Sequence, residues 1–176
     1  MKAGARLRIN WKNYWQIHNQ KGSLMSERTI KIERIMKASP ERIWHCWSEP
    51  KLFEQWYCPK PWAVKLMLQE LHNGGKLHLK FEGPDGAGFE KHGLILECIP
   101  NKKMIFTDAF TEAWEPSSRA LHVISFELEG LGDGTTKYIT KTKYWNIEDF
   151  EEQTKNGYLQ GTNMALNQLE ALLQIV

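Results

Sequence analysis

The sequence predicts an α+β fold in which a curved antiparallel sheet buries its apolar face against a C-terminal helix. Three observations support this prediction. The residues from Asn146 onward carry an apolar stripe at helical spacing, six consecutive segments before them are typical of antiparallel strands, and one more strand and two short helices precede those segments. A sheet of about seven strands has few other partners for its apolar face, so the final helix must cover it.

The final helix is the most clearly marked element of the chain. Apolar residues recur at steps of three and four from Tyr158 to Val176, which predicts one long continuous helix over residues 146–176. Asn146 is a suitable N-cap, and the acidic residues that follow it complement the helix dipole. Gly157 and Gly161 disfavour a helix, so their spacing indicates a side where another group approaches the backbone closely.

The chain divides into a basic N-terminal extension, residues 1–25, and a single domain over residues 26–176. A length of 176 residues with 41% hydrophobic content suits one domain with a sizeable core. Residues 1–24 carry five basic side chains and no acidic one, which leaves 18 basic against 21 acidic side chains in the rest. We expect no nucleic-acid partner for this mildly acidic body, because phosphate binding needs several Lys or Arg on one face.

The composition also bears on the compartment. No stretch approaches the roughly 18 apolar residues of a membrane span, and the basic extension lacks the apolar core of a signal peptide. The three cysteines, Cys46, Cys58 and Cys98, form no C-x-x-C pair. An odd number of cysteines without such a pair is typical of free thiols in a reducing compartment, so we expect a cytoplasmic location.

The first part of the domain is predicted to be a strand followed by two short helices. Residues 29–36 alternate apolar and charged side chains, as in a strand. Ser39 and Pro40 form a strong helix start, and the helix runs to about Ser48. Pro50 breaks it, and a second short helix ends before Pro59.

From Trp62 the pattern changes to a period of two, which predicts six strands in a meander. Residues 64–68 and 77–81 form a hairpin around Asn73-Gly74-Gly75. The remaining strands are predicted over residues 89–99, 104–110, 121–128 and 135–145.

Several short motifs stand at fixed places in this order of elements. They are Ala38-Ser39-Pro40-Glu41-Arg42-Ile43-Trp44, Trp56-Tyr57-Cys58-Pro59, Gly74-Gly75-Lys76-Leu77, His92-Gly93, Pro100 and Phe106-Thr107-Asp108-Ala109-Phe110. In order and spacing, residues 26–175 resemble the START-like (SRPBCC) superfamily, and within it the group named for the C-terminal domain of the activator of Hsp90 ATPase.

This resemblance implies a helix-grip (START/Bet v 1-like) fold, a curved sheet wrapped around a long C-terminal helix. In many relatives the cavity between them holds a hydrophobic small molecule. The chain departs from the family at Trp56-Tyr57-Cys58-Pro59, where Trp-Trp-Gly-Pro is common. That difference changes the expected shape of the cavity mouth.

Aromatic residues are the main candidates for a ligand-binding site. The chain has eight Trp, seven Phe and five Tyr, and apolar cavities with a few polar groups are how proteins hold small molecules. Their alternative role is to fill the core, and the sequence does not separate cavity wall from core. With the resemblance, we expect His92 to be the polar anchor and the wall to comprise Trp56, Trp62, Phe81, Phe106, Phe110, Trp114, Phe126 and Tyr158.

No motif indicates a metal, a cofactor or a catalytic nucleophile. The six histidines form no H-x-x-x-H pair, and no serine lies in G-x-S-x-G. Glu90, Glu97 and Asp108 would form an acid/base set only if they faced the cavity, and charged strand residues more often face water. We therefore expect no metal site, no cofactor and no catalytic residues.

These observations predict a non-enzymatic domain that binds a small hydrophobic or amphipathic molecule between the sheet and the final helix. The sequence leaves the ligand and the oligomeric state open. One alternative is a protein-interaction module that serves as a co-chaperone for an Hsp90-type chaperone, as the family name suggests. Another is a cyclase- or hydratase-like enzyme, which needs at least two titratable groups with shifted pKa values converging in the cavity.

Overall fold

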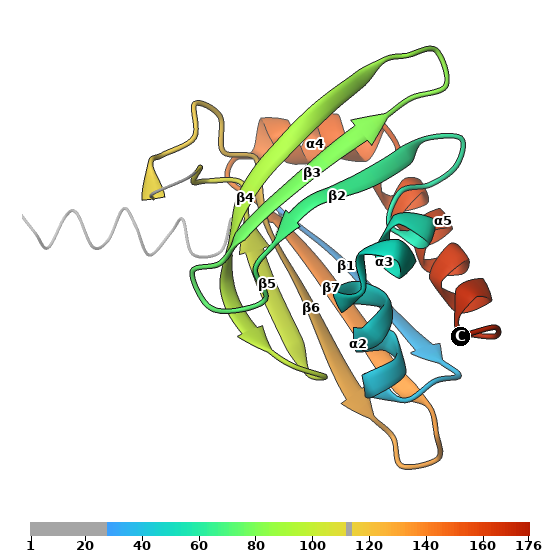
Figure 1. The fold of residues 1–176 in the computed structure, drawn as a ribbon. Helices are drawn as coiled ribbons and strands as arrows, with labels where there is room; N and C mark the ends of the chain where they lie inside the picture. Colours follow the sequence, from blue (N-terminus) through green and yellow to red (C-terminus); the bar gives the residue numbers. More distant parts are fainter. Residues whose placement is uncertain (1–27, 112–113) are drawn as a thin grey trace, which may run out of the picture.

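The computed structural model describes residues 28–111 and 114–176, and the N-terminal extension expected over residues 1–25 lies outside them. The described residues form one seven-stranded antiparallel sheet and four helices, as Figure 1 shows. The α+β class and the number of strands are therefore as predicted. No helix in this part of the chain is long and apolar enough to cross a membrane.

The sheet has the strand order β1-β7-β6-β5-β4-β3-β2, so the first strand pairs with the last. Its strands are β1 (Thr29–Met36), β2 (Ala63–Gln69), β3 (Lys76–Glu82), β4 (Gly88–Ile99), β5 (Lys103–Thr107), β6 (His122–Gly130) and β7 (Thr136–Tyr144). Register shifts between Leu66 and Leu68 and between Ile95 and Glu97 interrupt two ladders. Such bulges bend strands, and the sheet in Figure 1 is strongly curved.

Two short helices follow β1, as the sequence predicts. Ser39 accepts a hydrogen bond from Arg42 N at 3.5 Å and caps α2 (Pro40–Ser48). Glu49 is extended, and Pro50 then opens α3 (Pro50–Trp56). Both helices lie with α5 on the same side of the sheet (Figure 1).

The prediction of one continuous final helix is wrong. Residues 147–172 form two helices, α4 (Ile147–Lys155) and α5 (Tyr158–Leu172), and Gly157 between them has a left-handed φ of 84°. Only glycine adopts that conformation readily, so the chain changes direction there. The predicted start is confirmed, because Asn146 Oδ1 accepts a hydrogen bond from Asp149 N at 2.7 Å.

One core joins these helices to the sheet. Trp47 from α2, Phe53 from α3 and Phe126 from β6 are buried in one hydrophobic cluster with three leucines of α5: Leu166, Leu169 and Leu172. The polar side of α5 is fastened to β1, since Arg34 donates to Asn163 Oδ1 at 2.8 Å and to Asn167 Oδ1 at 2.7 Å. Helix α5 is thus held against the sheet by apolar burial and by hydrogen bonds.

Candidate functional site

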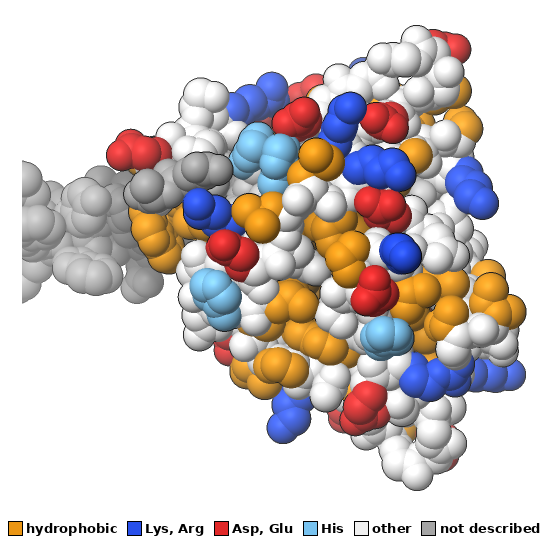
Figure 2. Space-filling view, in the orientation of Figure 1, with side chains coloured by type: hydrophobic (Ala, Val, Ile, Leu, Met, Phe, Trp, Pro, Cys, Tyr) orange, Lys and Arg blue, Asp and Glu red, His pale blue; other side chains and the backbone are white. Residues whose placement is uncertain are grey.

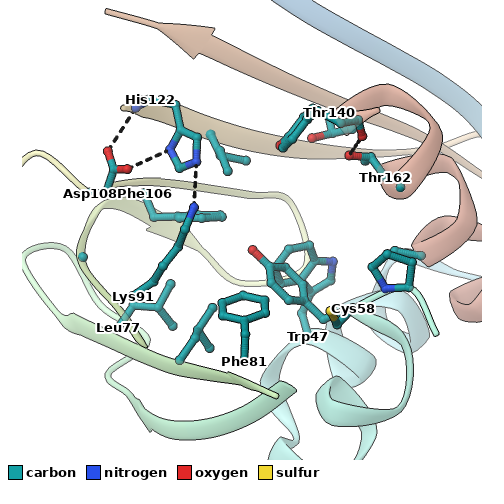
Figure 3. Close-up of a pocket in the computed structure, with 18 of the residues that line it drawn as sticks. Trp47, Cys58, Leu77, Phe81, Lys91, Phe106, Asp108, His122, Thr140 and Thr162 are labelled. Carbon is teal, nitrogen blue, oxygen red and sulfur yellow. Dashed lines mark hydrogen bonds and ion pairs between the residues drawn. The ribbon is translucent and has the colours of Figure 1, made fainter. Parts of the chain in front are cut away.

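A cavity of about 280 Å³ lies between the sheet and α5 (Figure 3). This volume is close to the lower end of small-molecule pockets, about 300 Å³. Most of the wall is aromatic or aliphatic and comes from α2, α3, α5 and the strands β3 to β7, with Trp47, Trp56, Leu79, Phe81, Phe106 and Leu166 among the residues that line it. A wall of this kind suits the apolar part of a small molecule.

Strand alternation decides which side chains reach this cavity. Leu77, Leu79 and Phe81 alternate along β3 and share one face of the sheet. Lys91 on β4 pairs in register with Leu79, so its side chain points to that same face. A lysine thus enters an otherwise apolar wall.

Lys91 belongs to a polar cluster at one end of the cavity, together with His122 and Asp108. Lys91 Nζ lies 3.4 Å from His122 Nε2, and His122 Nδ1 lies 3.5 Å from Asp108 Oδ2. Asp108 Oδ1 accepts hydrogen bonds from the backbone N–H groups of Leu121 and His122, both at 3.0 Å. Figure 3 shows His122 between the other two, with Asp108 beside it and the end of Lys91 below it.

Burial controls the charges of this polar cluster. Desolvation, with the positive charge of Lys91 next in importance, lowers the pKa of His122 to about 4, so the imidazole is neutral at pH 7. Desolvation also lowers the pKa of Lys91, and the charge of Asp108 opposes that effect. The cluster therefore presents an ammonium group beside a neutral imidazole.

The ammonium of Lys91 is poorly satisfied. Among the residues that the structure describes, His122 Nε2 is the one hydrogen-bond acceptor recorded for Lys91 Nζ, although an ammonium has three donors. A buried charged group with unmet hydrogen bonds is costly. An acceptor oxygen supplied from within the cavity would relieve that cost.

The segment that follows α3 lines another part of the cavity. Gln168 on α5 donates to Trp56 O at 2.9 Å and to Cys58 O at 2.8 Å, while Lys60 N donates to Gln168 Oε1 at 3.1 Å. These three bonds hold the segment carrying Tyr57 against α5. Gln168 therefore helps to fix the position of Tyr57 in the wall, together with the ring contacts of Tyr57 to Trp47 and Phe53.

Tyrosine hydroxyls add further polar groups to this wall. The Tyr158 hydroxyl and Thr142 Oγ1 lie 2.8 Å apart. Burial raises the pKa values of Tyr57, Tyr138 and Tyr158, so all three phenols stay neutral across the physiological range. They can donate or accept hydrogen bonds but carry no charge.

Five of the nine residues proposed from the sequence as ligand-binding line the cavity: Trp56, Phe81, His92, Phe106 and Tyr158. His92 borders the cavity with its ring elsewhere, since that ring stacks on His78 with centroids 4.0 Å apart and its side chain is 45% exposed. The register pairs His92 with His78, which alternates with the cavity-facing Leu77 and Leu79. The side chain that points into the cavity from this part of β4 is that of the neighbouring Lys91.

The other four residues lie outside the cavity wall. Phe126 is packed in the core and stacks on Trp47 with centroids 4.1 Å apart. Trp62 packs near Phe89, at a centroid distance of 6.0 Å. Phe110 contacts Trp114, which is 56% exposed.

Sequence reasoning missed Lys91 and His122 and judged Asp108 to be a residue that faces water. A signal was present for Lys91, because the hairpin turn at residues 83–86 fixes the register and places residue 91 opposite Leu79. His122 and Asp108 come together through the pairing of β5 with β6, across the segment 108–121. No local spacing indicates that approach.

Comparisons with known proteins agree with this architecture. A family model described as activator of Hsp90 ATPase homolog 1-like protein matches residues 37–174. A crystal structure of a Nitrosomonas europaea protein is 25% identical, with a TM-score of 0.79 over 84% of this chain and 95% of that chain. A comparison with curated proteins gave no match.

Two further solved structures show the same fold at lower identity. A protein from Arthrobacter aurescens, solved by NMR, is 22% identical, with a TM-score of 0.74 over 85% of this chain and 88% of that chain. A protein from Mycobacterium smegmatis is also 22% identical, with a TM-score of 0.71 over 86% and 94% of the two chains.

Proposed function

The chain belongs to the family of activator of Hsp90 ATPase homolog 1-like proteins, and we propose that its cavity binds a small amphipathic molecule with an anionic head group. In this proposal α5 is the helix that the curved sheet grips, and the cavity between them is the binding site. The observation that carries the proposal is the poorly satisfied ammonium of Lys91 at the end of an apolar cavity.

The head group is argued from Lys91. A carboxylate placed at its ammonium would form a charge-assisted hydrogen bond in a site of low dielectric constant, where such bonds are strong. Neutral His122 adds no charge, and Asp108 Oδ1 is already occupied by hydrogen bonds from two backbone N–H groups. The selectivity for an anion therefore rests on Lys91.

The apolar part is argued from the remaining wall. Leu77, Leu79 and Phe81 on β3 face Ala165 and Leu166 on α5 across the cavity. Burial of an alkyl chain between them contributes about 0.8 kcal/mol for each methylene group. A chain of moderate length is sufficient for measurable affinity once the head group is paired.

Calorimetric titration with octanoate and with 1-octanol tests this proposal. The two probes share a chain and differ in head group. We expect octanoate to bind more tightly, and the substitution Lys91→Met to weaken octanoate binding at least about tenfold while leaving octanol binding nearly unchanged. Lys80→Met is the matched control. Lys80 lies between Leu79 and Phe81 on β3, so its side chain points away from the cavity, and its ammonium forms an ion pair with Glu82 at 2.9 Å.

Each result of the titration bears on the proposal. If neither probe binds, the cavity does not take amphipathic molecules of this size and the proposal fails. Equal effects of Lys91→Met on both probes would show that Lys91 does not recognise the head group. Native mass spectrometry of the purified protein, followed by solvent extraction, identifies any resident molecule and its chemical class.

A second candidate function is proton transfer on a bound carbonyl compound, as in a cyclase- or hydratase-like enzyme. It is favoured by His122 and Lys91, two titratable groups in one cavity whose pKa values are both lowered by burial. A neutral imidazole at pH 7 can accept a proton. Deuterium exchange of 2-octanone in D₂O, faster with the protein than with the His122→Gln variant, would support this activity; exchange at the buffer rate would exclude it for that ketone.

An Hsp90-type chaperone is the remaining partner expected from the sequence, and the family description names activation of the Hsp90 ATPase. A pull-down with the host's Hsp90 separates this role from small-molecule binding. If the Lys91→Met variant is still pulled down by Hsp90, the chaperone contacts a surface other than the cavity.

A further inference from the structure

Three side chains on the outer face of the sheet, His78, His92 and Glu90, converge at one point. His78 Nε2 lies 2.7 Å from Glu90 Oε2, and His92 Nε2 lies 3.9 Å from the same oxygen. One possible ligand atom from each residue lies within 4.8 Å of the other two. Figure 2 shows histidine side chains gathered on the surface in the region of β3 and β4.

The sheet register holds this cluster together. His78 on β3 is directly opposite His92 on β4, and Glu90 is two residues before His92, which places all three on one face. The two imidazole rings stack with centroids 4.0 Å apart and planes inclined by 23°. The three donors therefore lie on two paired strands. Because the backbone there is already ordered, no loop has to fold for the donors to come together.

We infer that His78, His92 and Glu90 form a binding site for a divalent transition metal of the zinc type. Two imidazoles and a carboxylate are donors that Zn²⁺ uses, with bonds of about 2.0 to 2.2 Å. Atoms on one tetrahedral zinc then lie about 3.3 Å apart. Two of the three donor separations, 2.7 and 3.9 Å, bracket this value and the third is within 4.8 Å, so rotation of the side chains would bring the donors onto one ion.

The site leaves one coordination position open to solvent. The three side chains are 25%, 45% and 50% exposed for His78, His92 and Glu90, respectively. Lys80 faces Glu90 from β3 on the same side, but its ammonium is paired with Glu82 at 2.9 Å. The site is separate from the cavity, because Lys91, between Glu90 and His92, points to the opposite face.

Calorimetric titration of the full chain with Zn²⁺ alone, after treatment with a chelator, tests this inference. We expect one ion per chain and a rise in melting temperature with zinc concentration. Glu90→Gln and His78→Gln should each weaken zinc binding at least tenfold. His45→Gln is the matched control, since His45 is exposed on α2 and should leave the affinity unchanged.

Co²⁺ as a spectroscopic probe separates this site from the cysteines. Cys58 and Cys98 are only partly buried, and a thiolate ligand gives cobalt an intense charge-transfer band that imidazole and carboxylate do not. Equal zinc affinity in the wild type and in the double variant His78→Gln/His92→Gln, a thiolate band, or no binding at micromolar zinc would each overturn the inference. The conservative variant Glu90→Gln keeps the test valid if a histidine variant fails to fold.

Discussion

His122 is a residue whose burial should be visible as a pH dependence of stability. Its pKa is lowered to about 4 in the folded protein, first by desolvation and then by Lys91, whereas an unfolded chain has a histidine pKa near 6.5. Between pH 4 and pH 6.5, His122 therefore binds a proton in the unfolded state but not in the folded state. The contribution of neutral His122 to the free energy of unfolding is fully present above about pH 6.5 and is lost as the pH falls toward about 4.

We predict that the free energy of unfolding of the wild type decreases by on the order of 3 kcal/mol more than that of His122→Gln between pH 7 and pH 4. Glutamine cannot titrate, so the difference between the two proteins isolates this one group from the other histidines. The measurement is urea denaturation at several pH values. Parallel curves for the two proteins would show that His122 is not held neutral.

The individual residues of the cavity differ in how well the sequence predicts them. The sequence pointed to the correct strand and to His92, which borders the cavity, but not to Lys91, whose side chain points into it. A shift of one residue moves a side chain to the other face of a sheet, and the local pattern around residue 91 has no strong apolar alternation to fix the parity. The aromatic residues have the same difficulty, since Phe126 and Phe106 are both inward-facing yet only Phe106 lines the cavity.

At the scale of elements, the strands and the two short helices were predictable because the sequence carries start signals for the helices and turn residues between most of the strands. Ser39-Pro40 and Pro50 start the helices, and turns that contain glycine separate β2 from β3, β3 from β4 and β6 from β7. The break between α4 and α5 was missed because the N-cap at Asn146 and the apolar stripe that starts at Tyr158 were assigned to one helix, although residues 151–157 carry no apolar side chain. A glycine within a helical pattern is compatible with both a helix interior and a left-handed turn, and the tertiary packing decides between them.

The two glycines of this region predict opposite effects on stability. Gly157 has a φ of 84°, so Gly157→Ala should destabilise the protein by about 1 to 2 kcal/mol. Gly161 lies within α5, and an added Cβ would meet Pro59 Cγ at an ordinary 3.7 Å. Gly161→Ala should therefore be neutral or stabilise the protein by up to about 1 kcal/mol.

Urea denaturation of both glycine variants checks this pair, and each serves as the control for the other because the added methyl group is the same. Destabilisation of both proteins to the same extent would contradict the assignment of Gly157 as the residue that breaks the helix. Gly161 also lines the cavity, so its alanine variant should bind octanoate more weakly while remaining fully folded.

At the scale of the whole molecule, the two ends of the chain should differ in importance. In the part of the chain that the structure describes, the sheet begins at Thr29, and the core and the cavity comprise residues that follow it. At the other end, four leucines of the C-terminal region are buried in the core: Leu166, Leu169, Leu172 and Leu173. Burial of each contributes about 1.5 to 3 kcal/mol, so together they match the whole net stability of a typical domain, about 5 to 15 kcal/mol.

We therefore predict that removal of residues 146–176 leaves the protein unfolded, while a chain that starts at Met25 keeps the cooperative thermal transition of the full protein. Loss of α5 would also remove the partners of Arg34 and the Gln168 contacts that position the segment after α3. Circular dichroism during heating and size-exclusion chromatography distinguish the outcomes. A folded, monodisperse protein without residues 146–176 would show that the sheet does not depend on α5, and a chain from Met25 with a much lower melting temperature would place part of the fold in the N-terminal extension.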